Sequence, residues 1–140
     1  MDHISSALRH KVATAAGHRC GYCLTDQRIS GAQMHIEHII PVSQGGDSTE
    51  ANLWLACAWC NSYKGAKTYA TDPVTGGEVP LFNPRTQQWF DHFRWSDDGA
   101  HIIGLTPIGR ATVLTLKLNN EFILPARRNW VLAGWHPPQE

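Results

Sequence analysis

Four cysteines lie at spacings that suit metal binding. They form two Cys-x-x-Cys pairs, Cys20 with Cys23 and Cys57 with Cys60. Each such turn presents two thiolates on one side, and two turns complete the tetrahedral shell that Zn²⁺ prefers. Because a four-cysteine shell leaves no open coordination position, we expect a structural zinc. Two disulfides or redox-active thiols are the alternatives, and a reducing compartment favours metal over both.

The polar residues between and just after these pairs suit phosphodiester hydrolysis. Such a reaction needs a base that activates water and a divalent cation that neutralises the phosphate. His38 is a candidate base because imidazole ordinarily titrates near neutrality. Glu37 and Asn61 offer the oxygen ligands that Mg²⁺ or Mn²⁺ prefers, and Asn52 can hydrogen-bond the backbone or the imidazole. Each residue alone also has an ordinary explanation, such as a surface histidine or a capping asparagine. Their joint order favours a catalytic site.

This order of motifs resembles the HNH endonuclease family. The resemblance covers residues 17–67 and includes Glu-His-Ile-Ile-Pro, Gly-Gly and Asn-Leu-x-x-x-Cys-x-x-Cys-Asn-x-x-Lys. It implies the ββα-metal fold with one catalytic divalent ion, Mg²⁺ or Mn²⁺, with Ni²⁺ or Co²⁺ as further options. The whole chain also looks like a small bacterial HNH protein type, which implies a free-standing protein.

The resemblance also implies roles for single residues. His38 is expected to be the general base, and Asn52 is expected to support the base and the loop. Asn61 stands where the family often has histidine, which makes this an HNN variant, and is expected to bind the ion. Glu37 stands where the family more often has aspartate, and it is also expected to bind the ion. His35, two residues earlier on the same strand face, is the rival ligand.

The elements that must position these residues can be read from the pattern in the first half of the chain. A helix is predicted over 4–16, with Ser5 or Ser6 as its cap. Strands are predicted within 33–42, a short helix at 50–52, and a helix over 61–69 that begins directly after Cys60. The predicted order is strand, strand, helix, with zinc at its base.

The second half predicts a β-hairpin over 93–104, a helix that starts at Thr106-Pro107, and a final helix over 126–133. The fold class is therefore α+β. We expect one domain over 1–140, with an HNH core at 17–70 and an extension at 71–140 packed on it.

Composition and charge limit the partners. The formal net charge is +0, so nucleic-acid binding must depend on local basic residues, and Lys64 and Lys67 are the candidates for phosphate contacts. No apolar run approaches the roughly 18 residues that a membrane span needs. The N-terminus has no signal pattern, so a cytoplasmic protein is expected. DNA is the expected partner, and an oligomer or an accessory protein stays open. The alternatives are a non-catalytic zinc module that binds nucleic acid, and an RNA-directed nuclease.

Overall fold

The computed structural model describes residues 4–138 as a mixture of short helices and two-stranded sheets. The α+β class is therefore confirmed. The described residues divide into two compact units, the first made of 4–68 and 83–87, the second of 69–82 and 88–138. The predicted single domain, whose ends lie outside the described residues, stays a prediction. So does the packing of an extension on a core.

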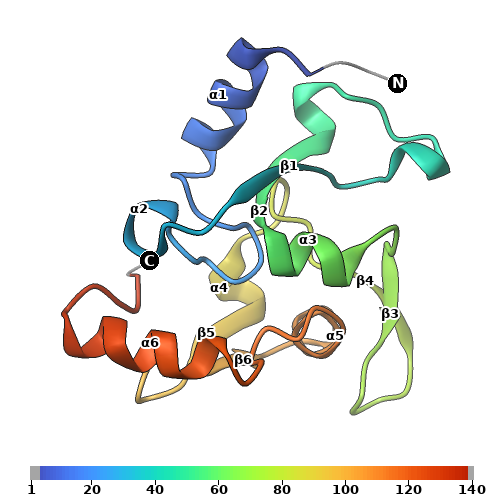
Figure 1. Cartoon of the computed structure of the whole chain (residues 1–140). Helices are drawn as coiled ribbons and strands as arrows, with labels where there is room; N and C mark the ends of the chain where they lie inside the picture. Colours follow the sequence, from blue (N-terminus) through green and yellow to red (C-terminus); the bar gives the residue numbers. More distant parts are fainter. Residues whose placement is uncertain (1–3, 139–140) are drawn as a thin grey trace. The chain divides into compact units, whose positions relative to one another are not determined.

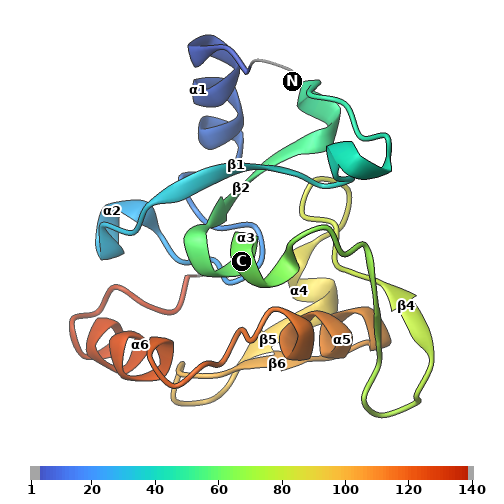
Figure 2. The same cartoon turned by 45° about the vertical axis from the view of Figure 1, so that its right-hand side comes forward.

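The first unit is built on an antiparallel hairpin. Its elements are α1 (Ser6–Ala15), α2 (Gln27–Ser30), β1 (Met34–His38), β2 (Leu53–Cys57) and α3 (Ala58–Lys64). β1 pairs with β2 along its whole length. Figures 1 and 2 both show α1 on one side of this hairpin and α3 on the other. A strand, strand, helix unit is therefore present.

Helix α1 covers one face of the hairpin. Of the two caps that the sequence predicted, Ser5 and Ser6, it is Ser5 that accepts a hydrogen bond from the backbone N–H of Leu8. Val12 is fully buried and packs in a cluster with Ile4 and Leu53, against which Leu8 and Ile36 also lie. Because strand side chains alternate, this apolar face leaves Glu37 on the opposite face of β1.

The second strand and the helix after it differ from the prediction. Strands were predicted within 33–42, but β1 ends at His38 and its partner is Leu53–Cys57, an apolar run that follows the connecting loop. α3 begins at Ala58, earlier than predicted, because the Cys57 side chain accepts the backbone N–H of Cys60 and caps the helix. It ends at Lys64, because Gly65 adopts a φ of 53°.

The second unit has its own core and two further hairpins. Its elements are β3 (Tyr69–Thr71), β4 (Glu78–Pro80), α4 (Trp89–His92), β5 (Phe93–Trp95), β6 (Ile102–Gly104), α5 (Pro107–Thr115) and α6 (Ile123–Leu132). β5 and β6 pair antiparallel, which confirms the predicted hairpin. Thr106 caps α5 as predicted, by accepting the N–H of Gly109. Buried side chains form this core: Phe82, Trp89, Phe93, Ile102, Leu116 and Leu118.

The final helix begins at Ile123, three residues before the predicted start. None of the helices within residues 4–138 is long and apolar enough to cross a membrane.

Candidate functional site

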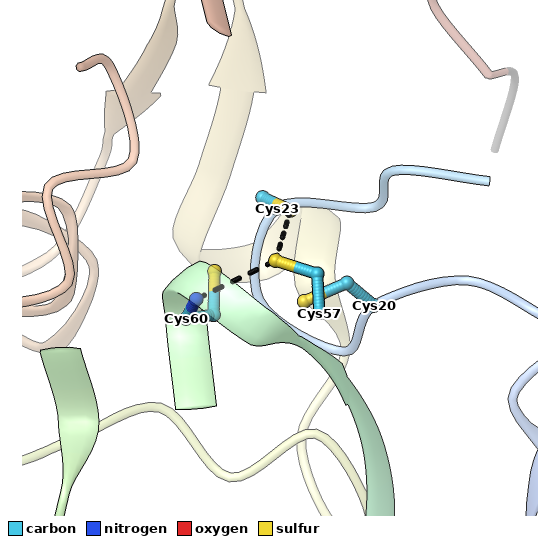
Figure 3. Close-up of side chains that lie close together, drawn as sticks. All are labelled: Cys20, Cys23, Cys57 and Cys60. Atoms are coloured by element: carbon cyan, nitrogen blue, oxygen red, sulfur yellow. Dashed lines mark hydrogen bonds between the residues drawn. The ribbon is translucent and has the colours of Figure 1, made fainter. Parts of the chain in front are cut away.

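The four cysteines converge at the base of the hairpin. Figure 3 shows the sulfurs of Cys20 and Cys23, from one loop, beside those of Cys57 and Cys60, from the end of β2 and the start of α3. The four Sγ atoms all lie within 4.8 Å of one another, and those of Cys23 and Cys57 are 3.7 Å apart. In a tetrahedral site with Zn–S bonds of about 2.3 Å, neighbouring sulfurs are about 3.8 Å apart. The cluster is therefore compatible with a structural metal such as zinc.

The electrostatics of these thiols also suit a divalent cation. Burial raises the pKa of the Cys20 thiol well above its ordinary value. Hydrogen bonds from the neighbouring thiols, Cys20 first, lower the pKa of Cys23. Four ionised sulfurs at this spacing would repel one another strongly, and a bound divalent cation would offset that repulsion.

The predicted catalytic residues at the end of β1 and on α3 line one pocket. An open cavity of about 260 Å³ is lined by the end of β1, the start of the connecting loop and α3. Glu37, His38 and Asn61 all line it. His35 does not line this pocket, and it lies opposite Ala56 in the hairpin. Glu37 therefore shares a pocket with His38 and Asn61, and the choice between Glu37 and His35 as a metal ligand stays a prediction.

Glu37 is a buried carboxylate with one engaged oxygen. Its exposed fraction is 4%. Oε1 accepts a hydrogen bond of 2.9 Å from the Tyr22 hydroxyl and lies 2.9 Å from the ammonium of Lys64. Oε2 is buried and has no hydrogen-bond partner within the part of the chain that the structure describes. Burial raises the pKa of Glu37 above its ordinary value, and the attraction of Lys64 offsets this only in part.

Tyr22 donates to Glu37 from inside the first cysteine pair. Burial raises the pKa of the Tyr22 phenol well above its ordinary value, and the nearby Glu37 charge raises it further. The phenol is therefore protonated at neutral pH and acts as a hydrogen-bond donor.

His38 is held by the connecting loop. Its Nε2 lies 2.8 Å from the Oγ of Ser48. In the tautomer with a protonated Nε2, that nitrogen donates to Ser48 and Nδ1 keeps its lone pair. An imidazole oriented in this way can accept a proton at Nδ1.

Asn52 organises the same loop with its whole side-chain amide. Its Oδ1 accepts the backbone N–H of Ile40 at 2.9 Å. Its Nδ2 donates to the carbonyls of Ile40 at 2.9 Å and Asp47 at 2.8 Å. Asn52 thus bonds backbone rather than imidazole, and it reaches His38 through the loop that carries Ser48.

The two predicted phosphate contacts have different environments. Lys64 is only 2% exposed, and its Nζ also donates to the carbonyl of Ile39 at 3.1 Å. Burial of this ammonium against protein partners argues against a phosphate contact, and the predicted contact of Lys64 with phosphate stays a prediction. Lys67 is exposed and lies beyond the end of α3, where its Nζ donates to the Tyr63 carbonyl. Its contact with phosphate stays a prediction.

Three further residues support the site and were not singled out from the sequence as doing so. Tyr22 donates a hydrogen bond to Glu37, and Ser48 is the partner of His38. Arg85 lies in the Asn83–Gln87 segment, where its Nε donates to the Leu53 carbonyl at 3.1 Å and its guanidinium lies 4.9 Å from the centre of the Trp54 ring. The position of Tyr22 inside a cysteine pair was the one available signal. Arg85 lies 32 positions from Leu53. Ser48 lies only ten positions from His38, but no local pattern marks their contact.

Comparison with known proteins agrees with this geometry. Residues 20–67 match the family model described as HNH endonuclease. This segment contains both cysteine pairs, the hairpin and α3. No curated protein and no solved structure matched the chain. The match makes residues 20–67 an HNH endonuclease domain and supports a nuclease-type function in general.

Proposed function

We propose that this HNH domain is a metal-dependent endonuclease that hydrolyses phosphodiester bonds of DNA. One observation carries the proposal: Glu37, His38 and Asn61, contributed by a strand and a helix, line the same open pocket. The four-cysteine cluster joins that strand pair to that helix, so the pocket stands on a frame that a structural zinc would hold.

His38 is the proposed general base. Ser48 holds its Nε2, which leaves Nδ1 to take the proton from an attacking water. Asn52 fixes the loop that presents Ser48, so its contribution is to the orientation of the base. The resemblance to HNH endonucleases implies products that carry 5′-phosphate and 3′-hydroxyl ends.

Glu37 and Asn61 fit a catalytic divalent ion. The buried Oε2 of Glu37 has no hydrogen-bond partner within residues 4–138, and a hard cation would satisfy it. The side-chain amide of Asn61 supplies a second oxygen in the same pocket. Mg²⁺ or Mn²⁺ at these residues would neutralise the scissile phosphate and stabilise the departing 3′ oxygen.

Lys67 is the proposed contact to the phosphate backbone of the substrate. Lys67 is an exposed cation near the end of α3. The chain's formal net charge is +0, so the protein as a whole has no long-range attraction for a polyanion. A weak intrinsic affinity follows, and an accessory protein or a particular DNA structure would supply the rest.

One observation favours the alternative of a non-catalytic zinc module. Lys64 already supplies a positive charge to Glu37 at 2.9 Å, so the carboxylate has a counter-ion without any divalent cation. In such a module the pocket would bind nucleic acid, and loss of the His38 side chain would leave its function intact.

Plasmid cleavage tests the proposal. Wild type, His38→Ala and the matched control His10→Ala, an exposed position on α1, are each assayed with EDTA, Mg²⁺, Mn²⁺ and Ni²⁺. We expect metal-dependent nicking or linearisation by wild type and His10→Ala. Cleavage by His38→Ala should fall by about 100-fold or more, the usual contribution of a general base.

Other outcomes would change this assignment in different ways. If His38→Ala cleaves as well as wild type, the assignment of His38 as the base is rejected. If no cation supports cleavage by zinc-loaded, folded protein while DNA binding survives in both variants, the non-catalytic module is correct. Cleavage of RNA but not DNA in a parallel assay would reassign the substrate.

A further inference from the structure

Lys64 is a buried cation whose two partners lie on either side of His38. Its Nζ is 2.9 Å from Oε1 of Glu37 and 3.1 Å from the carbonyl oxygen of Ile39. Its exposed fraction is 2%. A buried ammonium is costly unless it is paired and hydrogen-bonded, and here both partners come from the same three-residue stretch of chain. Lys64 therefore holds the backbone and side chain next to the proposed base.

Lys64 also joins the two elements that carry the site. It is the last residue of α3, one turn after Asn61, whereas Glu37 lies in β1 and Ile39 directly follows that strand. The ion pair and hydrogen bond thus set the spacing between Asn61 on the helix and Glu37 with His38 at the strand end.

Tyr22 acts on the same carboxylate from the other cysteine pair. It lies between Cys20 and Cys23, and its hydroxyl donates to Oε1 of Glu37 at 2.9 Å. Oε1 therefore receives two donors, one from the first cysteine pair and one from the helix that starts at the second. The carboxylate is held in one orientation, and Oε2 is the oxygen left for a cation.

We propose that Tyr22 and Lys64 are positioning residues of this site: together they hold Oε1 of Glu37 so that Oε2 binds the divalent ion, and Lys64 sets the spacing of Asn61 and His38. The inference rests on the proposed nuclease function. It adds that Glu37 binds the ion through one oxygen, and that the cysteine cluster acts on the site through two named side chains. Outer partners of metal ligands commonly change affinity or activity by 10–100-fold.

Tyr22→Phe tests the first half, because it removes one donor and keeps the ring. Mn²⁺ binding is measured from the electron paramagnetic resonance signal of the unbound ion, together with zinc content and cleavage. We expect unchanged zinc content and Mn²⁺ affinity about tenfold weaker than wild type. Cleavage should recover towards wild type as the Mn²⁺ concentration rises. Tyr69→Phe, at an exposed tyrosine of β3, is the matched control.

Lys64→Met tests the second half by removing the ammonium. The Glu37 carboxylate then lacks its counter-ion, so Mn²⁺ should raise the thermal midpoint of this variant more than that of wild type. If the variant folds only with Mn²⁺ present, the ion stabilises it even more strongly than this expectation requires. Cleavage should fall by about 100-fold at every Mn²⁺ concentration, because the ion replaces the charge but not the bond to Ile39. Lys11→Met, which removes an exposed lysine paired with Glu50, is the control.

Several results would overturn the inference, and they differ from failure of the nuclease function. Wild-type Mn²⁺ affinity in Tyr22→Phe, even with lowered stability, would show that Tyr22 has a structural role only. If Mn²⁺ raises the thermal midpoint of Lys64→Met and of wild type equally, Lys64 too has a structural role only. If wild type binds Mn²⁺ but cleaves no nucleic acid, the function fails while the binding data still decide the positioning. If wild type binds no Mn²⁺, the positioning role is rejected whatever the protein cleaves.

Discussion

At the scale of single residues, Asn52 is the clearest case of a side chain whose chemistry is entirely local. Within residues 4–138, its side-chain amide makes three hydrogen bonds to backbone groups of one loop, at Ile40 and Asp47. Both backbone groups of Ile40 depend on this one side chain. The loop in turn presents Ser48 to His38. Asn52 therefore bonds the backbone of the loop that also carries Ser48, the partner of the imidazole.

Asn52→Ala should destabilise the first unit by about 1–3 kcal/mol, because three backbone hydrogen bonds lose their partner at roughly 1 kcal/mol each, less what water restores. Urea unfolding measures this change, and cleavage should fall with it because Ser48 is no longer held. Asn129→Ala, at an exposed position of α6, should stay within about 0.5 kcal/mol of wild type. A stable Asn52→Ala protein with wild-type cleavage would show that the loop is held by other contacts.

At the scale of elements, the loop between β1 and β2 depends on a close approach of its own backbone. A side-chain Cβ at Gly46 would collide with the carbonyl of Ile40 and come within 2.9 Å of Nδ2 of Asn52. Gly45, next to it, has open space around it but adopts a φ of 88°. The two glycines are therefore required for different reasons, one steric and one conformational.

Comparison of Gly46→Ala with Gly45→Ala tests this distinction. Gly45→Ala should cost about 1–2 kcal/mol, the ordinary penalty of a left-handed alanine. Gly46→Ala should cost more and should also lower cleavage, because the backbone that Asn52 bonds must move. Urea unfolding and plasmid cleavage of both variants give the comparison. Equal losses for the two variants would argue against the steric explanation.

In the second unit, an ion pair between Asp72, directly after β3, and Arg110, on α5, connects two elements. Asp72 is fully buried. Each of its carboxylate oxygens accepts an N–H of Arg110 at 2.9 Å. It also accepts the backbone N–H groups of Val74 and Thr75, which shapes the turn between β3 and β4. Arg110 and these amides hold the pKa of Asp72 well below its ordinary value.

This low pKa predicts an acid-dependent loss of stability. A carboxyl group with a depressed pKa stabilises the fold above its unfolded pKa of about 3.9, and this stabilisation disappears as the pH falls towards the folded pKa. The free energy of unfolding of wild type should therefore exceed that of Asp72→Asn above about pH 4, and the difference should shrink as the pH is lowered. Asp97→Asn, in an exposed turn, is the control for a surface carboxylate, and its stability should stay within about 0.5 kcal/mol of wild type. A constant difference between wild type and Asp72→Asn would contradict this account.

At the scale of the whole molecule, the two units have different sources of stability. The core of the first unit is a small cluster around Ile4, Val12 and Leu53, supplemented by the cysteine cluster. The second unit contains an aromatic core in which Trp89 lies against Phe93 and Trp95. Small cores commonly depend on a bound metal for stability, so the first unit is the one expected to need zinc.

Chelation should therefore affect the units unequally. Hydrogen exchange after removal of zinc should show lost protection in β1, β2 and α3, while β5, β6 and α5 keep theirs. Return of protection on addition of Zn²⁺ is the control for reversibility. Simultaneous loss of protection in both units would instead indicate one cooperative domain, as the sequence-based prediction of a single domain requires.

Much of this protein could be read from local patterns. The two cysteine pairs, the cap of α1 at Ser5, the start of α5 at Thr106 and the hairpin over 93–104 all depend on residues close together in sequence. Such signals act over a few residues, so they survive without knowledge of the rest of the chain. The α+β class follows from them, and so does the HNH resemblance over 17–67, of which the family model matches 20–67.

The partnerships across the chain were decided by the tertiary structure. Periodicity placed Lys64 on a helix surface beside Asn61, but the hairpin brings the Glu37 carboxylate against that helix and the lysine is buried. β2 reads as an apolar run that only its pairing with β1 identifies as a strand. The bond from Tyr22 to Glu37 spans fifteen positions of the chain, and the pairing of Lys64 with Ile39 spans twenty-five. Local propensity carries no information about such contacts, because they form only when the elements pack and bury their polar groups together.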